Sequence, residues 1–135
     1  MKLRDQVLAI LSFATVAVCW KNTAAFEFAS PECKGLISKA WIGMNYEQIA
    51  MKNSTQSIYI ATANDGIWRW YGYPSATEDG TACYGEPIGR LHWPCFDLNG
   101  FVAKEGKPRV ECIRLCSMWA GKEHSYSCAA IGITE

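Results

Sequence analysis

The amino-acid sequence predicts an α+β domain, in which two or more helices lie on one face of an antiparallel sheet of four to five strands and disulfides join the layers. Three observations lead to this fold class. Two turn sequences, Asn64-Asp65-Gly66 and Asn99-Gly100, each stand between apolar runs and indicate β-hairpins. Two other stretches carry apolar residues at helical spacing. Finally, the chain of 135 residues contains 7 cysteines.

Residues 1–25 have the composition of a secretory signal peptide. Two basic residues precede an almost wholly apolar run that ends at Trp20, and small residues follow up to Phe26. We therefore expect this leader to be removed, and residues 26–135 to form a single cysteine-rich domain that is secreted. No later apolar run approaches the length of a membrane span, so we expect no contact with a membrane.

Six cysteines remain once Cys19 is removed with the leader. They are the candidate disulfide residues Cys33, Cys83, Cys95, Cys112, Cys116 and Cys128. An even number of cysteines in a small secreted domain predicts three disulfides, although the spacing leaves their connectivity open. Because no pair has the Cys-x-x-Cys spacing of structural zinc sites, we expect neither zinc nor another cofactor.

Charge is nearly balanced in the predicted mature domain. Ten basic and 12 acidic residues follow residue 25, which gives a formal net charge of −2. No basic stripe is present of the kind that follows a nucleic-acid backbone. We therefore expect no nucleic acid as a partner, and we expect the domain to be a monomer.

The first part of the domain is expected to be helical. Ser30 is a good N-cap and Pro31 suits the first helical position, and apolar residues then recur at helical spacing. This pattern predicts a helix over residues 31–41, to which Cys33 would bring a disulfide. Residues 45–51 are expected to add a short helical turn.

A modification motif follows this region. The tripeptide Asn53-Ser54-Thr55 matches the sequence required for N-linked glycosylation, which makes Asn53 a candidate glycosylation site. Such a short motif also occurs by chance, and it predicts a surface loop before the next strand.

Residues 57–73 are expected to form a hairpin with a three-residue loop at Asn64-Asp65-Gly66, which pairs Ile60 with Trp70. The alternation of side chains separates two faces. One face is assigned to the core, and it carries the core motif Trp68 and Trp70 with Ile58 and Ile60. The other face is a candidate interaction surface formed by Tyr59, Arg69, Tyr71 and Tyr73. Tyrosine and arginine are frequent in interface hot spots, although strand aromatics covered by a helix would give the same pattern.

The next stretch is expected to be a loop and a second hairpin. Residues 74–89 are rich in glycine, proline and polar residues, and Cys83 would fix this long loop to the domain. Residues 91–98 and 101–104 are expected to be strands, because Asn99-Gly100 is a strong two-residue hairpin signal.

Residues 108–120 give the clearest helical pattern. Cys112, Leu115, Cys116 and Trp119 follow the i, i+3, i+4, i+7 spacing of one helix face. The two cysteines would then project from that face and bond to different partners. Residues 125–133 alternate small and apolar residues, which predicts a last strand.

His92 and His124 are the candidates for general acid–base catalysis. A small secreted ribonuclease would need one of them beside a carboxylate and an arginine on the same sheet. The available partners are Glu86, Glu111, Glu123, Arg69 and Arg90. Because no catalytic motif surrounds these residues, we expect no enzyme, and a ribonuclease-like hydrolase is the alternative.

The strand sequence Trp68-Arg69-Trp70, in a small cysteine-rich protein with a leader, resembles the Leptosphaeria avirulence-and-suppressing (LARS) family of effectors. The resemblance covers chain size, leader, cysteine content and residues 67–71. It implies a sheet with helices stapled by disulfides, and a non-enzymatic virulence or avirulence effector of a plant-pathogenic fungus. Such an effector acts in the apoplast or the host cell. It binds host plant proteins and is recognised by plant immune receptors, or it masks recognition of another effector. A carbohydrate-binding module is a further alternative, since exposed aromatics also stack on sugar rings.

Overall fold

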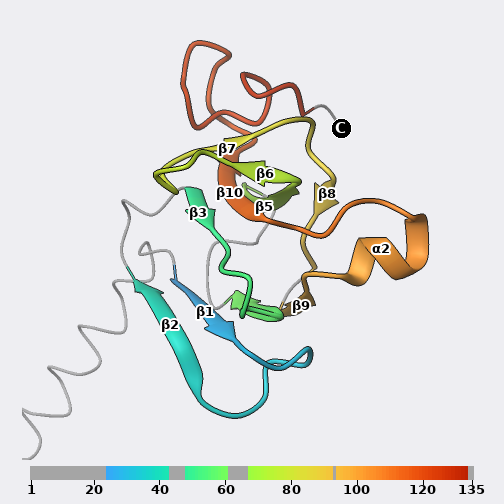
Figure 1. Cartoon of the computed structure of the whole chain (residues 1–135). Helices are drawn as coiled ribbons and strands as arrows, with labels where there is room; N and C mark the ends of the chain where they lie inside the picture. Colours follow the sequence, from blue (N-terminus) through green and yellow to red (C-terminus); the bar gives the residue numbers. More distant parts are fainter. Residues whose placement is uncertain (1–23, 43–47, 61–66, 93, 134–135) are drawn as a thin grey trace, which may run out of the picture.

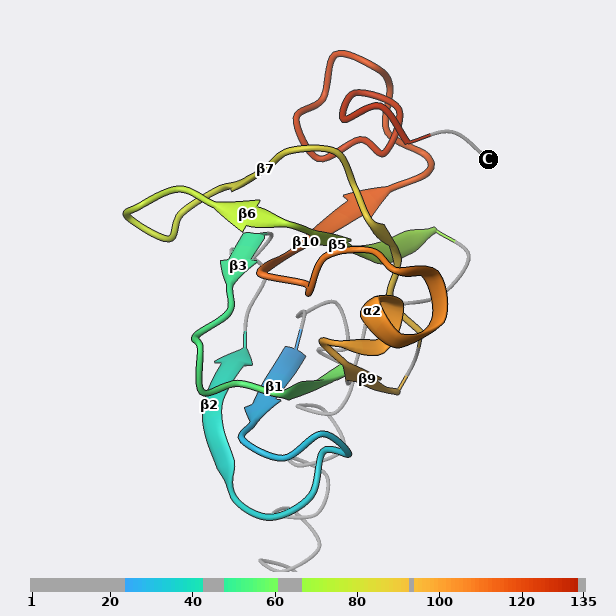
Figure 2. The same cartoon turned by 45° about the vertical axis from the view of Figure 1, so that its right-hand side comes forward.

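The computed structural model describes residues 24–42, 48–60, 67–92 and 94–133. These residues form two four-stranded sheets, a two-stranded sheet and one short helix. The protein is therefore mostly β, and the prediction of an α+β domain with two or more helices is wrong. Figures 1 and 2 show the two larger sheets one above the other, with the C-terminal segment beyond the upper sheet.

The first sheet contains four antiparallel strands in the order β2-β1-β4-β9. They are β1 (Ala24–Phe28), β2 (Ile37–Ile42), β4 (Ser57–Ile60) and β9 (Cys95–Asp97). Within the described ranges β2 pairs with β1 alone, so it is an edge strand of this sheet.

The second sheet has the order β3-β10-β5-β8. Its strands are β3 (Gln48–Ala50), β10 (Cys112–Ser117), β5 (Trp68–Tyr73) and β8 (Gly89–Arg90). The strands β6 (Ser75–Ala76) and β7 (Cys83–Tyr84) pair with each other. The helix α2 (Gly100–Glu105) follows β9.

The strands β5 and β10 are covered on both faces, which gives the protein two hydrophobic clusters. The first cluster lies between the two large sheets and contains Ile58 and Ile60 of β4 and Trp70 of β5. The second cluster lies on the other face and contains Tyr71 and Tyr73 of β5. A strand buried on both faces has a nearly continuous apolar sequence, so periodicity alone cannot distinguish it from a buried helix.

Three disulfides are present, as the number of cysteines predicts. They join Cys33 to Cys95, Cys83 to Cys112, and Cys116 to Cys128. The first links the turn between β1 and β2 to β9, and the second links β7 to β10. The third links β10 to the C-terminal segment, so Cys112 and Cys116 have different partners.

The expected hairpin over residues 57–73 is wrong, because β4 and β5 belong to different sheets. Ile60 lies opposite Ala25 of β1, and Trp70 lies opposite Leu115 of β10. The turn sequence at residues 64–66 lies outside the described residues. Ile60 and Trp70 nevertheless share the first cluster, since they meet across two packed sheets instead of along one hairpin.

The expected helix over residues 31–41 is a turn followed by β2. The Ser30 hydroxyl accepts a hydrogen bond from the Lys34 N–H at 3.0 Å and donates to the Lys34 carbonyl at 2.8 Å, so it closes a turn instead of capping a helix. Gly35 has a φ of 86°, which ends any helical continuation. Of the short helical turn expected at residues 45–51, residues 45–47 lie outside the described residues and 48–50 form β3.

The second expected hairpin is also wrong, because Asn99 is the N-cap of α2. Only β9 is formed from its first strand, and β9 pairs with β4. Packing of Phe101 accounts for the difference. The centroid of its ring lies 5.1 Å from that of Phe96. The ring also packs directly on Gly89, where a Cβ atom would lie only 2.8 Å from it. Tertiary contacts of one aromatic ring thus override the local turn signal.

The helix predicted over residues 108–120 and the strand predicted over residues 125–133 are also wrong. Residues 112–117 of the expected helix over 108–120 form β10, which pairs with both β5 and β3. A separation of four residues is two strand periods as well as about one helical turn, so Cys112 and Cys116 share a face in either structure. Residues 125–133 form turns in place of a strand, with one parallel bridge between Ser127 and Ser117. The expected loop at 74–89 contains β6 and β7.

Candidate interaction surface

The structure does not bring the predicted surface residues together on one exposed face. Tyr71 and Tyr73 are only 6% and 3% exposed, and they belong to the second cluster. Tyr59 is half-buried on β4 of the other sheet, where it lies opposite Phe26. Arg69 is half-buried on β5, opposite Cys116. Of the core motif, Trp70 is fully buried in the first cluster, and Trp68 is half-buried against it.

The C-terminal segment accounts for the burial of these tyrosines. Cys128 and Ile133 pack with Tyr71 and Tyr73 in the second cluster, and Cys128 is bonded to Cys116 of β10. Burial raises the pKa of the Tyr73 hydroxyl. That hydroxyl has no hydrogen-bond partner among the described residues. Tyr73 therefore behaves as a core residue in its environment, not as a recognition residue.

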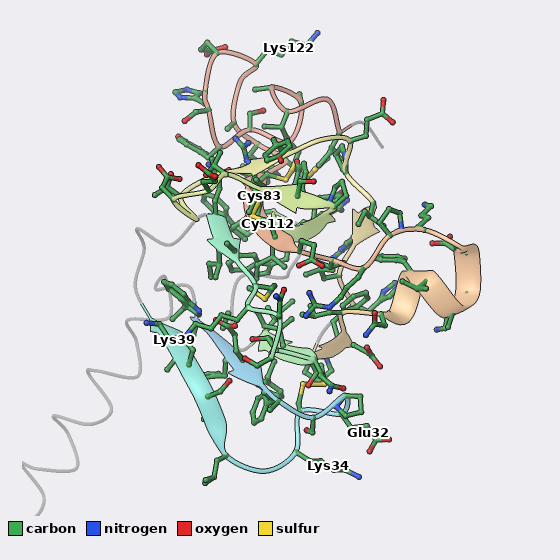
Figure 3. All side chains as sticks on the ribbon, in the orientation of Figure 1. Glu32, Lys34, Lys39, Cys83, Cys112 and Lys122 are labelled. Carbon is green, nitrogen blue, oxygen red and sulfur yellow. A yellow bond between two sulfur atoms is a disulfide. The ribbon has the colours of Figure 1, made fainter. Side chains whose placement is uncertain are left out.

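Among the described large apolar side chains, the most exposed aromatic ring lies instead on the loop between Cys116 and Cys128, here called the C-terminal loop (residues 117–127). Trp119 is 80% exposed, which is unusual for the largest apolar side chain. The exposed residues Lys122, Glu123 and His124 follow it. Figure 3 shows Lys122 at the outer end of this loop, away from both large sheets.

A stack of three rings, here called the ring stack, connects the C-terminal loop to β5. The Trp68 and Tyr126 centroids are 5.9 Å apart, and those of Tyr126 and His124 are 5.2 Å apart. Their interplanar angles are 29° and 31°. Since Trp68 also packs on the first cluster, the ring stack fixes one side of the loop to the body of the protein.

Backbone hydrogen bonds hold the base of the C-terminal loop. The Ser117 N–H donates to the Tyr126 carbonyl at 2.7 Å, and the Cys128 N–H donates to the Ser117 carbonyl at 2.9 Å. The Ser127 hydroxyl donates to the Ala120 carbonyl at 2.9 Å, and the Trp119 N–H donates to the Ser117 hydroxyl at 3.2 Å. With the disulfide, these contacts present Trp119 on an ordered backbone.

A second exposed apolar site lies in the turn between β1 and β2. Leu36 is 92% exposed, and Ile37 at the start of β2 is also exposed. Figure 3 shows Glu32 and Lys34 of this turn at the end of the molecule opposite to Lys122. The two exposed apolar sites therefore lie at opposite ends of the protein.

A shallow groove of about 580 Å³ opens beside the C-terminal segment. Tyr71, Pro87, Ile131 and Ile133 contribute apolar lining, and Glu86 contributes a carboxylate. The groove is open to solvent, and it adds a mixed apolar and acidic surface near the base of the C-terminal loop.

Of the candidate catalytic residues, the neighbours His124 and Glu123 form one contact. His92 is exposed and makes no hydrogen bond or ion pair with a described residue. The His124 Nε2 atom lies 3.7 Å from the Glu123 carboxylate, and its ring stacks on Tyr126. Glu111 pairs with Arg109 at 2.8 Å. These contacts do not assemble the histidine, carboxylate and arginine that the ribonuclease alternative requires.

The described part of the chain contains neither a metal-binding cluster nor a membrane-spanning helix. No group of three or more His, Cys, Asp or Glu side chains is placed to hold a metal ion. No helix there has both the length and the apolar character needed to cross a bilayer.

The turn between β6 and β7 is expected to depend on pH. The exposed Asp79 carboxylate accepts hydrogen bonds from the Thr77 and Thr81 hydroxyls at 2.6 and 2.7 Å, and these bonds lower its pKa to about 2. Because the pKa of Asp79 is lower in the folded state than the unfolded value of about 3.9, the ionised carboxylate stabilises the turn at pH values above about 3.9. This stabilisation disappears as the pH falls toward 2. The Thr81 amide shift of the folded protein, followed by NMR, should titrate with a midpoint near the folded-state pKa of Asp79, about 2. In Asp79→Asn, which keeps an acceptor but cannot titrate, it should not. A Thr81 shift that is flat in both proteins would contradict the assignment.

The sequence patterns do not identify the C-terminal loop as an interaction surface, because they predict Trp119 on a helix face and Tyr126 in a strand. The sequence feature that could have indicated this surface is a tryptophan among polar residues between two cysteines. Comparison with known proteins gives no match to a family model, to a curated protein or to a solved structure.

Proposed function

We propose that this chain is a secreted, non-enzymatic effector that binds a protein partner through the C-terminal loop, with Trp119 as its central contact. The observation that supports this most strongly is the 80% exposure of Trp119 on a loop closed by a disulfide. Tryptophan is the residue most enriched at interface hot spots, where it fills a pocket on the partner. The resemblance to the LARS effectors supports a partner from a host plant, as a target protein or an immune receptor.

The order of the loop also favours a binding role. Binding a flexible loop costs about 0.5–1.5 kcal/mol for each side chain that becomes fixed, in addition to the ordering of the backbone. Here the disulfide, the ring stack and the hydrogen bonds at the loop base fix the backbone in the free protein. A partner would therefore need to order little beyond the Trp119 side chain.

A protein partner fits this surface better than a sugar. Carbohydrate-binding platforms use flat, open aromatic faces. In the ring stack, the Tyr126 ring already packs against two other rings, with its centroid 5.9 Å from that of Trp68 and 5.2 Å from that of His124. Trp119 is an exposed ring, and the exposed charged residues Lys122 and Glu123 follow it in the same loop. An apolar centre with a charged rim is typical of protein interfaces.

Secretion is part of the proposal. The basic start of the chain and the apolar run that ends at Trp20, both before β1, support it. The three disulfides are compatible with an oxidising compartment. The protein would act in the apoplast or after entry into the host cell.

Infiltration of the purified protein into leaves of a panel of plant accessions tests the proposal. We expect at least one accession to respond with cell death, and Trp119→Ala to abolish the response. Because Trp119 is so exposed, the variant should keep the melting temperature of the unmutated protein. Leu36→Ala is the matched control, since it removes an exposed apolar side chain at the opposite end and should leave the response intact.

Four outcomes would contradict the proposal. A panel without any responding accession would contradict recognition by a plant receptor. A response that survives Trp119→Ala but is lost in Leu36→Ala would move the surface to the turn between β1 and β2. Retention on insoluble chitin or cellulose that depends on Trp119 would favour the carbohydrate-binding alternative. Cleavage of RNA that is lost in His124→Ala would favour the ribonuclease alternative.

A further inference from the structure

The glycosylation motif lies on an exposed turn. The Thr55 N–H donates to the Lys52 carbonyl at 3.0 Å, which closes a β-turn with Asn53 and Ser54 at its two central positions. Asn53 and Ser54 are both exposed. The Asn53 side chain makes no hydrogen bond with a described residue, so no such bond has to break before its amide reacts.

The backbone of this turn is fixed from both ends. The Arg109 guanidinium donates to the Lys52 carbonyl at 3.2 Å and to the Thr55 carbonyl, and it pairs with Glu111 at 2.8 Å. The Met51 N–H donates to the Glu111 carbonyl at 2.8 Å. A group attached to Asn53 would therefore extend into solvent from a rigid site without displacing any of these contacts.

Thr55, the third residue of the motif, has the opposite environment. It is 1% exposed, and its hydroxyl donates to Glu27 Oε1 at 2.6 Å. Glu27 is also buried, and its other oxygen accepts a hydrogen bond from Trp41 Nε1 at 2.6 Å. In the folded protein the Thr55 hydroxyl is therefore both hidden and committed to a buried carboxylate.

We propose that Asn53 carries an N-linked oligosaccharide and that it is attached before the domain folds. The motif requires a hydroxyl at its third position, so the transferring enzyme must contact Thr55. Folding removes this hydroxyl from access, while it leaves Asn53 exposed. The folded structure can thus hold the glycan but cannot acquire it. The inference rests on the secretory route of the proposed function, because the transfer takes place on chains that enter that route.

The chemical step is a glycosyl transfer. The Asn53 Nδ2 atom forms a bond to C1 of the first sugar of an oligosaccharide linked to a lipid pyrophosphate. The bond between C1 and the pyrophosphate oxygen breaks, and the lipid pyrophosphate leaves with the electron pair. The amide nitrogen loses one proton, and no oxidant or reductant is needed.

Expression of the full chain with its own leader in a eukaryotic secretory host tests the site. We expect the intact mass of the secreted protein to exceed the polypeptide mass and to fall on treatment with peptide N-glycanase, with conversion of Asn53 to aspartate. Asn53→Gln should lose the added mass and stay folded, because the Asn53 side chain is exposed and makes no hydrogen bond with a described residue. Thr55→Ser is the matched control, since it keeps a hydroxyl for the motif and for Glu27 and should keep the glycan.

Two failures are distinguishable. A secreted chain with an unmodified Asn53 would overturn the glycosylation site and leave the proposed function standing. A chain that stays in the cell with its leader attached would overturn the secretory route, and the site with it.

The order of events is tested in the same cells by adding dithiothreitol during a pulse label, which prevents the three disulfides from forming. We expect newly made chains to acquire the glycan in full under these conditions. Chains that gain it only after the reductant is removed would show that attachment follows folding, and this result would overturn the proposed order.

Discussion

Replacing Trp70 with alanine should lower the free energy of unfolding by about 3–5 kcal/mol. Trp70 is among the largest fully buried side chains of the protein, and it lies in the cluster between the two large sheets. Its removal would leave a cavity between the sheets. The sheets can close this cavity only in part, because backbone hydrogen bonds between strands hold them in place. Urea denaturation of the oxidised protein, with a two-state fit, measures the change.

Trp119→Ala is the control for this measurement, because the same substitution at an exposed position should change the free energy of unfolding by less than about 0.5 kcal/mol. Trp68→Ala, at a half-buried position on the same strand, should fall between the two. Equal losses for Trp70→Ala and Trp119→Ala would contradict the assignment of Trp70 to the core.

The alternation of apolar side chains along the strands indicates which residues share a face of a sheet, but not which strands pair with each other. Ile58, Ile60 and Trp70 were assigned to one core, and they do share the first cluster. The assumed pairing of Ile60 with Trp70 was wrong, because pairing depends on which distant strand, β1 or β10, offers a complementary face. The period of a strand is a local property, whereas its partner is decided by long-range packing.

Helical patterns failed where the spacing was compatible with both structures. Cys112 and Cys116 are four residues apart, which places them on one face of a helix or of a strand. Ser30 and Pro31 suit a helix start, yet the same residue types also favour turns. The exposed surface was missed for a related reason. Burial of Tyr71 and exposure of Trp119 are both determined by the path of the C-terminal segment, which has no periodic pattern.

The number of cysteines was the most reliable predictor, and it predicted the number of disulfides. Disulfide formation depends on an oxidising compartment and an even number of cysteines more than on local structure. The connectivity could not be predicted, since it follows from the strand order. Cys83 meets Cys112 only because β7 lies beside β10, and Cys33 meets Cys95 only because the first sheet places β9 next to β4. The disulfides therefore report the topology that the hairpin predictions missed.

Removal of the disulfide between Cys33 and Cys95 should lower the free energy of unfolding by about 4 kcal/mol in the Cys33→Ala/Cys95→Ala variant. This disulfide has the largest sequence separation of the three, at 62 residues, and cross-linking a longer loop restricts the unfolded chain more. The native turn has other contacts that should preserve it. The Cys33 N–H donates to the Ser57 hydroxyl at 2.8 Å, and the Ser57 hydroxyl donates to the Ser30 carbonyl at 2.5 Å. The loss should therefore come mainly from the unfolded state, with near-native chemical shifts in the folded one.

The matched variant is Cys116→Ala/Cys128→Ala, in which the separation is 12 residues and the entropic loss should be about 3 kcal/mol. Its folded state should change more, because Cys116 and Cys128 are fully buried in the second cluster and hold the C-terminal segment over Tyr71 and Tyr73. Denaturant melts of the two variants, with amide shifts of the C-terminal loop, separate these effects. The Cys33→Ala/Cys95→Ala variant could instead be the more stable of the two variants and yet show the larger changes in amide chemical shift. In that case restriction of the unfolded chain is not the main contribution of that disulfide. The turn between β1 and β2 would then depend on the covalent link itself.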